Sequence, residues 1–397
     1  MADDVSLDES FRAMVSSDAE LLSRQLQSHQ LRMFPPSAQK QLRKFTPAEA
    51  ASFIGIHQGY LRQVIAEGHG PKPNENGRRF YSAQDIENLR GVLDDGLKGG
   101  RKYVRHRTGD EQLQVISVMN FKGGSGKTTS SSHLAQYLAL RGYRVLAIDL
   151  DPQASLSAMF GHQPELDVGE NETIYGAIRY DEDRVDIRDI VRATYTPNLH
   201  LIPGNLELME FEHETPKVLG DGQQREAMFF ARIAACLSEI ESAYDVVVID
   251  CPPQLGFLTL SALCAATAVL ITVHPQMLDV MSMSQFLNMT GDLLAVVENA
   301  GGSMSYDWMR YLITRYEPND GPQNQMTGFM RSIFGKRVLE NEMLKSTAIS
   351  DAALTKQTLY EVSRSQFTRG TYDRALDALT AVNSEIEDKI LSTWGRK

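Results

Sequence analysis

A short run of glycine, lysine and hydroxyl residues is the part of the sequence best suited to binding phosphate. Residues 122–129 read KGGSGKTT and follow an apolar segment. Glycines permit backbone conformations that a Cβ disfavours, so consecutive N–H groups of such a loop can converge on phosphate oxygens. A lysine at the end of the loop can reach the outer phosphates, and the next hydroxyl can bind Mg²⁺. We therefore expect a phosphate loop made of Gly123, Gly124, Ser125, Gly126, Lys127, Thr128 and Thr129.

Acidic residues follow two other apolar segments. Asp149 and Asp151 come at the end of residues 145–150, and Asp250 directly follows residues 246–249. Ligands of open α/β sheets gather at the carboxyl ends of the strands. We therefore expect these carboxylates beside the phosphate loop, with Asp250 holding Mg²⁺ through water. A single acid at a strand end is as often a simple cap, but the loop and the acids occur here in the order of a nucleotide site.

The segments around these residues alternate between short apolar runs and helical patterns. The runs expected to be strands are residues 115–119, 145–150, 199–202, 246–249, 268–273 and 308–314 and, less clearly, residues 337–342. Continuous apolar strands separated by helices predict a parallel sheet covered on both faces. The expected fold class is α/β, with a doubly wound, mostly parallel sheet in residues 111–397.

Composition narrows the class of protein. The chain has 397 residues, 42% of them apolar, and a net charge of −11, and its length suggests more than one domain. Its apolar runs are shorter than the roughly 18 residues that span a bilayer. The first residues are acidic, and the three cysteines lack metal-ligand spacing. These features predict a cytoplasmic protein with no membrane partner.

The first 110 residues differ from the rest in charge and pattern. Residues 41–110 hold 12 Lys and Arg against 8 Asp and Glu, whereas residues 111–397 hold 24 against 37. Such unevenness is typical of a small polyanion-binding module attached to an acidic body. Residues 1–40 predict a helical arm that ends at two prolines. The apolar positions of this arm at helical spacing are Met14, Leu21, Leu22 and Leu26.

The segment that follows the arm has the pattern of a helix-turn-helix. Thr46 and Glu49 can form a capping box at the start of a first helix. Gly55 can then make the turn before a second helix. Asn76 and Gly77 predict the turn of a hairpin wing. The segment is therefore expected to be a winged helix-turn-helix domain and linker, residues 41–110.

This order of elements resembles the winged DNA-binding module of MerR-type regulators. In such modules the second helix contacts base edges and phosphates, and wing arginines contact the flanking backbone. The residues expected to contact DNA are Gln58, Tyr60, Arg62, Gln63, Arg78 and Arg79. The alternative is a helical dimerisation cap whose arginines are simply solvated.

The phosphate loop resembles that of a known family. Residues 122–129 match KGGxGKT[ST], the signature of the deviant Walker A family of P-loop ATPases, which includes ParA partition proteins, MinD and the nitrogenase iron protein. The resemblance covers about residues 114–385. It implies ATP as the nucleotide, and it implies that Lys122 reaches phosphates bound by a partner subunit in a sandwiched dimer. It further implies that Asp151 orients the attacking water and that Asp149 lies near the Mg²⁺ shell.

The resemblance also implies a function. A ParA-type ATPase would bind non-specific DNA as a homodimer, act at the nucleoid, and be stimulated by a ParB-like centromere-binding protein. The N-terminal module adds repression of its own operon. Where many partition ATPases have Pro-Arg, this chain has Leu344 and Lys345, and Lys345 is expected to keep a DNA-contacting charge. Further candidates for a non-specific DNA surface are Arg331, Lys336 and Arg337.

Other classes of function are weighed against this one. A transcriptional repressor whose nucleotide only switches conformation would carry the same motifs, and DNA-stimulated ATP hydrolysis would separate the two. A MinD-like membrane ATPase needs a basic amphipathic C-terminal helix, whereas residues 384–397 hold three acids. A nitrogenase-like reductase needs paired cluster cysteines, and Cys251 and Cys264 are better interpreted as small core residues.

Overall fold

The computed structural model describes residues 11–33, 40–96, 102–220, 228–302 and 304–396, except for the side chains of residues 26–33. The chain forms two compact units, residues 1–40 and residues 41–397. The first unit contains helix α1 (Phe11–Met33), whose side chains are exposed through residue 25. The arm is therefore helical as predicted. Pro35, Pro36 and the side chain of Leu26 lie outside the described residues.

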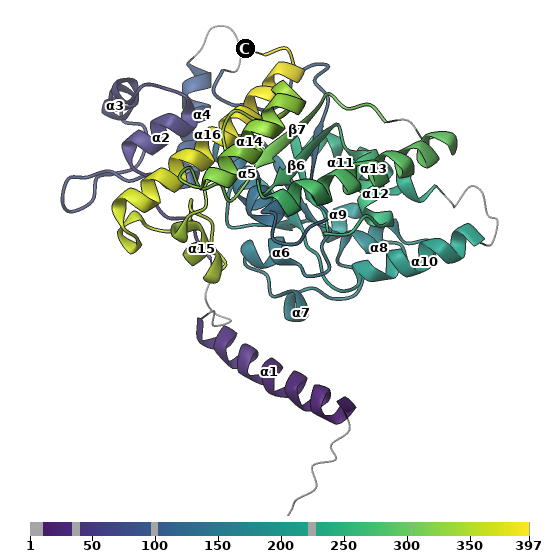
Figure 1. Cartoon of the computed structure of the whole chain (residues 1–397). Coiled ribbons are helices and arrows are strands. Elements are labelled where there is room, and N and C mark those ends of the chain that lie inside the picture. Colours follow the sequence, from purple (N-terminus) through teal and green to yellow (C-terminus); the bar gives the residue numbers. More distant parts are fainter. Residues whose placement is uncertain (1–10, 34–39, 97–101, 221–227, 303, 397) are drawn as a thin grey trace, which may run out of the picture. The chain divides into compact units, whose positions relative to one another are not determined.

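Within the described part of the second unit, seven strands form one sheet in the order β3-β4-β2-β5-β1-β6-β7. Its neighbouring strands are parallel except for β3 and β4. The strands are β1 (Gln114–Met119), β2 (Val145–Asp149), β3 (Arg192–Ala193), β4 (Leu199–Ile202), β5 (Val246–Asp250), β6 (Ala268–Val273) and β7 (Trp308–Ile313). The predicted doubly wound, mostly parallel sheet is thus confirmed, and Figure 1 shows the helices that surround it.

The less clear prediction of a strand at residues 337–342 is wrong. In this region a 3-10 turn, η3 (Gly335–Arg337), leads into a segment that touches β7 at separate points. Leu339 donates its N–H to Tyr311 O and Met343 donates to Ile313 O, both at 2.9 Å. Four residues along this segment therefore match two along β7, so the residues between cannot continue a regular ladder.

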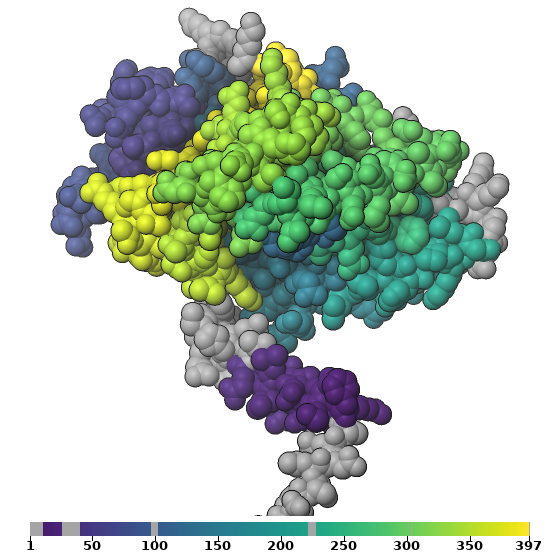
Figure 2. Space-filling view, in the orientation of Figure 1, coloured from purple at the N-terminus to yellow at the C-terminus, as the bar shows by residue number. Residues whose placement is uncertain are grey.

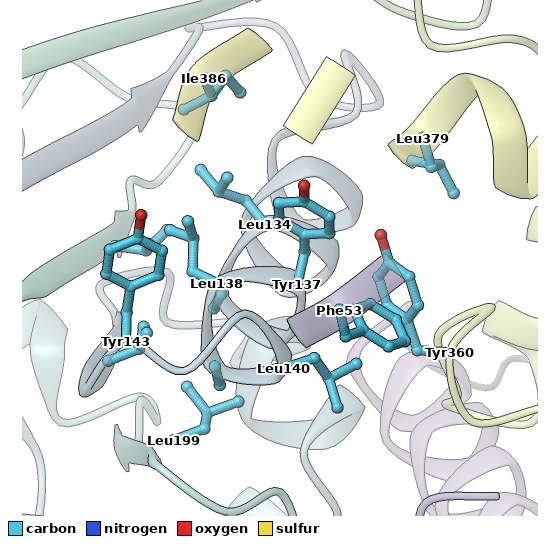
Figure 3. Packing of buried hydrophobic residues seen from close by; sticks show 14 of the residues in the cluster. Phe53, Leu134, Tyr137, Leu138, Leu140, Tyr143, Leu199, Tyr360, Leu379 and Ile386 are labelled. Carbon is cyan, nitrogen blue, oxygen red and sulfur yellow. The ribbon is translucent and has the colours of Figure 1, made fainter. Parts of the chain in front are cut away.

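Helices cover both faces of the sheet. Successive side chains of a strand point to opposite faces, so each face has a hydrophobic core of its own. Ile116 and Val118 of β1 belong to one core, which Figure 3 shows around α5, while Val115 and Met119 belong to the other. Among the described helices, none is long and apolar enough to cross a bilayer. The helices of this unit are α2 (Pro47–Ile54), α3 (Gln58–Ala66), α4 (Ala83–Asp95), α5 (Lys127–Leu140), α6 (Ser155–Met159), α7 (Pro164–Asp167), α8 (Ile174–Ile178), α9 (Ile187–Ile190), α10 (Leu208–Gly220), α11 (Arg232–Ile240), α12 (Phe257–Ala265), α13 (Met277–Asn299), α14 (Gly321–Phe334), α15 (Thr347–Leu354) and α16 (Arg369–Thr393), with further 3-10 turns η1 (Phe229–Ala231), η2 (Glu241–Ala243) and η4 (Arg364–Gln366).

Helix α2 has the two caps that the sequence predicts. Thr46 accepts the N–H of Glu49 through its side chain, and the Glu49 carboxylate accepts the N–H of Thr46, which completes the capping box of α2. Gly55 ends α2 in the left-handed region with a φ of 84°. The turn between α2 and α3 therefore lies at the glycine expected for it.

The expected hairpin after α3 differs in detail. Gly77 donates its N–H to Asn74 O at 2.9 Å, and Asn74 donates to Arg78 O at 2.7 Å, so a tight turn forms where it was predicted. Regular strands do not flank this turn in the described residues, and a single antiparallel bridge joins Phe45 to Tyr81. Oδ1 of Asn74 accepts the backbone N–H groups of Asn76 and Arg78, and these bonds take the place of a longer ladder.

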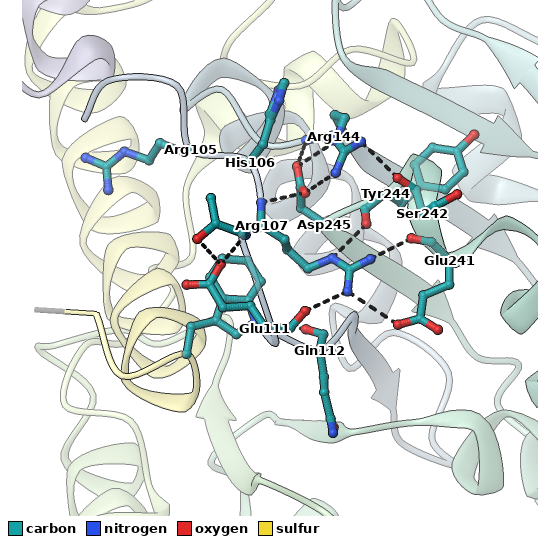
Figure 4. A network of polar contacts seen from close by, with 12 residues as sticks. Arg105, His106, Arg107, Glu111, Gln112, Arg144, Glu241, Ser242, Tyr244 and Asp245 are labelled. Carbon is teal, nitrogen blue, oxygen red and sulfur yellow. Dashed lines mark hydrogen bonds and ion pairs between the residues drawn. The ribbon is translucent and has the colours of Figure 1, made fainter. Parts of the chain in front are cut away.

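The segment expected to be a linker is fastened to the body of the protein from residue 102 onward. The Asp94 carboxylate accepts the backbone N–H groups of residues 102–104 at 2.7 to 2.8 Å. Farther along, as Figure 4 shows, the Arg107 guanidinium donates to the backbone carbonyls of Glu111, Glu241 and Tyr244. The described part of this connection is therefore a fixed strap.

A buried arginine joins α4 to the end of α5. Arg90 is 1% exposed and donates to Phe53 O at 2.7 Å and to Leu140 O at 2.6 Å. Burial lowers the pKa of its guanidinium to about 10, against the opposing attraction of Glu87. Gly142, with a φ of 96°, makes room for this side chain, because a Cβ there would lie 2.7 Å from Arg90 Nε.

Glu387 of α16 completes the contact between the N-terminal helices and the sheet domain. Its buried carboxylate accepts from Arg141 at 2.9 Å and from the hydroxyls of Tyr137 and Tyr143 at 3.1 and 2.9 Å. Arg105 of the strap pairs with the same carboxylate at 3.3 Å. Figure 2 shows the surface of the N-terminal helices, in purple and blue, meeting that of the yellow C-terminal helix. Both parts share one hydrophobic core.

Candidate phosphate-binding site

The predicted phosphate loop connects the end of β1 to the first turn of α5. Gly124 and Gly126 have φ values of 75° and 87°, which residues with a Cβ rarely adopt. Gly126 immediately precedes Lys127, the first helical residue. The first N–H groups of a helix have no partner within the helix, and they attract anions. The structure thus brings residues 123–129 together in one loop and one helical turn.

Lys127 is a buried ammonium at the base of this loop. The side chain is 6% exposed, and Nζ donates to Lys122 O at 3.4 Å. Burial lowers the pKa of Lys127, while the carboxylates of Asp250 and Asp151 raise it. An ammonium has three donors, so one long hydrogen bond leaves it short of acceptors. Phosphate oxygens in the loop would supply them.

Asp149 and Asp250 lie in register on the neighbouring strands β2 and β5, and both are buried. Asp149 is satisfied by the protein: Oδ2 accepts the N–H and the hydroxyl of Ser157 at 2.8 and 2.7 Å, and Oδ1 accepts the N–H of Asp151 at 3.2 Å. Oδ1 of Asp250 accepts the Ser131 hydroxyl at 2.9 Å. Oδ2 of Asp250 finds no hydrogen-bond partner among the described residues.

The environment of this acid pair suits a divalent cation. Burial raises the pKa of both carboxyls; the charge of Asp250 raises that of Asp149 further, and the charge of Asp151 raises that of Asp250. A bound cation would favour the ionised forms. The Thr128 hydroxyl is near enough to Asp250 to lower the pKa of that carboxyl, and carboxylate and hydroxyl oxygens are ligands that Mg²⁺ prefers. The residues present therefore fit a Mg²⁺ ion.

Asp151 lies at the rim of the same edge, half-buried. Its Oδ1 accepts the N–H of Gln153 at 2.9 Å. It is close enough to Lys127 to raise the pKa of that lysine. Because the Asp151 carboxylate is only half-buried and lies near Lys127, a water molecule could reach it.

Lys122 lies apart from the two buried acids. Its side chain is 45% exposed, and its ammonium forms an ion pair with Asp279, near the start of α13. The other carboxylate oxygen of Asp279 lies 3.2 Å from Nδ1 of His274. With Arg315, these side chains line a cavity of about 250 Å³ beside the loop.

Several residues around the loop were not predicted. His274 directly follows β6, and Thr314 and Arg315 directly follow β7, so the strand-end rule applied to every strand could have found them. Ser131 and Ser157 carry no such signal, because the fold alone brings them to Asp250 and Asp149.

Six of the seven residues expected to contact DNA lie in the N-terminal helical segment. Four belong to α3, where Tyr60 is 42% exposed, Arg62 is exposed, Gln58 is half-buried and Gln63 bonds to Glu67 at 3.2 Å. Arg78, which is exposed, and Arg79, which is half-buried, follow the tight turn.

Lys345, the seventh, lies elsewhere, in the segment beside β7. Its ammonium pairs with Glu317 at 2.8 Å. Arg331 of α14 likewise pairs with Glu342 at 2.6 Å. Two of the basic residues expected on a DNA surface therefore have carboxylate partners.

Known proteins resemble this chain over most of its length. A family model for an AAA domain matches residues 113–299. The chain is 61% identical over 388 residues to a replication protein A of Rhizobium rhizogenes, with 97% of this chain and 96% of the relative covered. It is 29% identical over 366 residues to SopA of Escherichia coli (strain K12), with 90% of each chain covered. The chain belongs to the ParA family of plasmid partition ATPases.

Within the ParA family, the chain is most like the RepA proteins of repABC-type plasmids. A solved structure described as a partition protein shares its fold, with a TM-score of 0.64 at 16% identity, covering 98% of this chain and 100% of that one. The chain thus has the P-loop ATPase fold of ParA-type proteins. The roles of the individual side chains are a separate question.

Proposed function

We propose that this ParA-family chain uses ATP and Mg²⁺ to segregate DNA. Two copies would bind ATP between them, attach to non-specific DNA, and release it when a ParB-like protein stimulates hydrolysis. The observation that carries this proposal is the pair of poorly satisfied groups beside the phosphate loop, the Lys127 ammonium and Asp250 Oδ2. A buried polar group without partners is costly, and a nucleotide with its metal would satisfy both.

Each residue of the site has a distinct part in the proposal. The loop N–H groups and Lys127 hold the phosphates, and Asp250, through water, holds Mg²⁺ together with the Thr128 hydroxyl. Asp149 supports the same shell from the neighbouring strand. When bound, Mg²⁺ would neutralise charge on the phosphate oxygens. Asp151, at the open rim, orients the attacking water.

Lys122 is proposed to act on the partner subunit. Its ammonium is partly exposed and pairs with Asp279, which it would have to leave to contact a second chain facing the loop. In a sandwiched homodimer it would contact the phosphates held by the partner. A cation placed there offsets the charge that shifts during phosphoryl transfer.

We further propose that residues 41–96 form a winged helix-turn-helix domain that represses the chain's own operon. α2, the left-handed turn at Gly55 and α3 follow one another in the order of that motif. Tyr60 and Arg62 on α3 are exposed, as a recognition helix requires. The tight turn that ends at Arg78 would hold the flanking DNA backbone.

Non-specific DNA is proposed to bind the basic residues in and after α14. Lys336 and Arg337 lie in the 3-10 turn η3 and are exposed. Lys345 and Arg331 would have to leave Glu317 and Glu342 to contact phosphate. Such contacts should weaken steeply as salt rises.

Steady-state ATP hydrolysis tests the proposed motor, measured for the chain alone, with DNA, and with DNA plus a ParB-like protein. We expect slow turnover that rises with each addition. The direct bond from α4 to the end of α5 favours a second candidate, a repressor whose nucleotide only switches conformation. That candidate predicts nucleotide-dependent operator binding with no turnover under any of the three conditions, a result that would exclude the motor.

A further inference from the structure

The carbonyl side of the phosphate loop is held by side chains at the ends of β6 and β7. Thr314 is buried and donates its hydroxyl to Ser125 O at 2.7 Å. Arg315 donates from Nη1 to Gly124 O at 3.1 Å. Thr272, in β6, donates its hydroxyl to the Ser125 hydroxyl at 3.0 Å. Two consecutive loop residues are therefore tied to the sheet by three side chains.

These bonds fix the direction of the N–H groups in the loop. In a trans peptide unit the C=O of one residue points opposite to the N–H of the next, and the described residues contain no cis peptide bond. Holding the carbonyls of Gly124 and Ser125 against β7 therefore turns the N–H groups of Ser125 and Gly126 the other way. That is the side on which a loop of this kind holds phosphate.

Arg315 adopts an unusual backbone conformation to make its bond. Its φ is 52°, in the left-handed region that residues with a Cβ seldom occupy. Strained conformations of this kind persist where the surroundings fix them, and they gather at functional sites. Thr314 is fixed in the sheet by its N–H bond to Val273 O at 2.9 Å. The left-handed backbone of Arg315, the next residue, occurs together with the bond from its guanidinium to Gly124 O.

We propose that Thr314 and Arg315 are positioning residues for the nucleotide. They hold the loop open before nucleotide arrives, with the N–H groups of Ser125 and Gly126 directed at the phosphates. This inference rests on the proposed binding of ATP in the loop. Because the same N–H groups would hold phosphates in the ground state and during transfer, loss of either residue should weaken binding more than turnover.

The test compares two pairs of variants and a matched control. Thr314→Val removes the hydroxyl at constant shape, and Thr314→Ser keeps it. Arg315→Gly removes the donor but accepts the left-handed backbone, and Arg315→Lys keeps a donor. Asn198→Gly is the control, because Asn198 also has a positive φ, 63°, but lies directly before β4. The measurements are the Kd for Mg²⁺-ATP and Mg²⁺-ADP, KM, kcat, and the melting temperature without nucleotide.

We expect Thr314→Val and Arg315→Gly each to raise Kd and KM by about tenfold, the effect of one lost hydrogen bond to a functional loop, with kcat changed less than about twofold. Thr314→Ser, Arg315→Lys and Asn198→Gly should stay near the unaltered chain. Should Thr314→Val fail to fold, as its melting temperature would show, the exposed Arg315 pair still decides the question. Unaltered binding by the folded Val and Gly variants overturns this inference alone. Failure of the unaltered chain to bind ATP overturns the proposed function as well.

Discussion

Lys127 shows how a single residue in this fold is prepared for a ligand. It is buried beside two carboxylates, yet its ammonium makes one long hydrogen bond to a backbone carbonyl. We predict that Lys127→Ala abolishes measurable binding of ATP and ADP, because the phosphates lose the nearest cation inside a buried site. Binding of labelled nucleotide measures this. Lys122→Ala is the control and should still bind, since its partly exposed ammonium pairs with Asp279 at the side of the loop; tight ATP binding by Lys127→Ala would contradict the assignment.

The acid pair predicts how stability depends on pH. Burial raises the pKa of Asp149 and Asp250 above the ordinary value of about 3.9. The protonated acids therefore favour the folded state, and their contribution is lost as pH rises through the raised pKa values. We predict that ionisation of this pair lowers the melting temperature of the nucleotide-free protein as pH is raised from 5 to 8. We also predict that Mg²⁺ with an ATP analogue stabilises the protein more at pH 8 than at pH 5.

The variant Asp250→Asn distinguishes the effect of this acid pair on stability from the effects of other titrating groups. An amide cannot ionise and relieves the repulsion on Asp149, so this variant should show a flatter pH profile and little extra stabilisation by Mg²⁺. If the variant and the unaltered chain give the same profile in thermal unfolding, the acid pair is not the cause.

At the scale of residues, the sequence reveals chemistry that is contiguous in the chain. The glycines, Lys127 and Thr128 are found because their spacing is itself the signal. Thr314 and Arg315 directly follow β7, so the strand-end rule that found Asp149 and Asp250 would also have found them had it been applied to that strand. Asp279 lies in the first turn of α13 and not at a strand end, and only the order β1-β6-β7 brings it beside the loop.

Helix α5 connects the two functional parts of the second unit. Its first turn belongs to the phosphate loop, and its last carbonyl, Leu140 O, accepts from Arg90 of the N-terminal helices. We predict that Gly142→Ala destabilises the protein by about 3 kcal/mol. The left-handed backbone costs roughly 1–2 kcal/mol for a residue with a Cβ, and displacing Arg90 breaks buried hydrogen bonds.

Gly68→Ala is the matched control, since Gly68 has a similar φ of 101° but open space around its Cα. Gly68→Ala should lose only the roughly 1–2 kcal/mol that the left-handed backbone costs a residue with a Cβ. Urea unfolding gives both values, and equal losses for the two variants would show that Arg90 can move aside without cost.

At the scale of elements, prediction succeeds where local rules dominate. The capping box of α2 and the apolar runs of the central strands are local, and both were found. Residues 337–342 have a strand-like composition, but residue 337 lies in the 3-10 turn η3, and the hydrogen bonds of Leu339 and Met343 to β7 are too widely spaced for a regular ladder. The two-residue β3 is too short to leave a pattern.

For the whole molecule, the N-terminal helices contact α5, whose first turn belongs to the phosphate loop. A mutation in that contact would disturb both the proposed DNA binding and the proposed nucleotide binding. Only mutations away from the contact can separate them. We predict that Arg78→Ala combined with Arg79→Ala weakens operator binding by at least tenfold and leaves DNA-stimulated ATPase activity nearly unchanged. The reason is that exposed Arg78 and half-buried Arg79 lie at the end of the tight turn, whereas the buried contact with α5 is made by Arg90. Arg188→Ala, on the sheet domain, is a matched control for lost charge. Unchanged operator affinity in the double variant would favour a helical cap without DNA contacts.

The mass of the protein in solution, measured by light scattering with Mg²⁺ and ATP, decides whether two copies share the nucleotide. Asp151→Ala is the variant of choice, because loss of the carboxylate that we propose to orient the attacking water should spare binding and slow hydrolysis. We predict two chains per particle for Asp151→Ala with ATP, and one chain for Lys127→Ala under the same conditions. A strictly monomeric Asp151→Ala protein that has bound ATP would contradict the sandwiched dimer and the segregation cycle that depends on it.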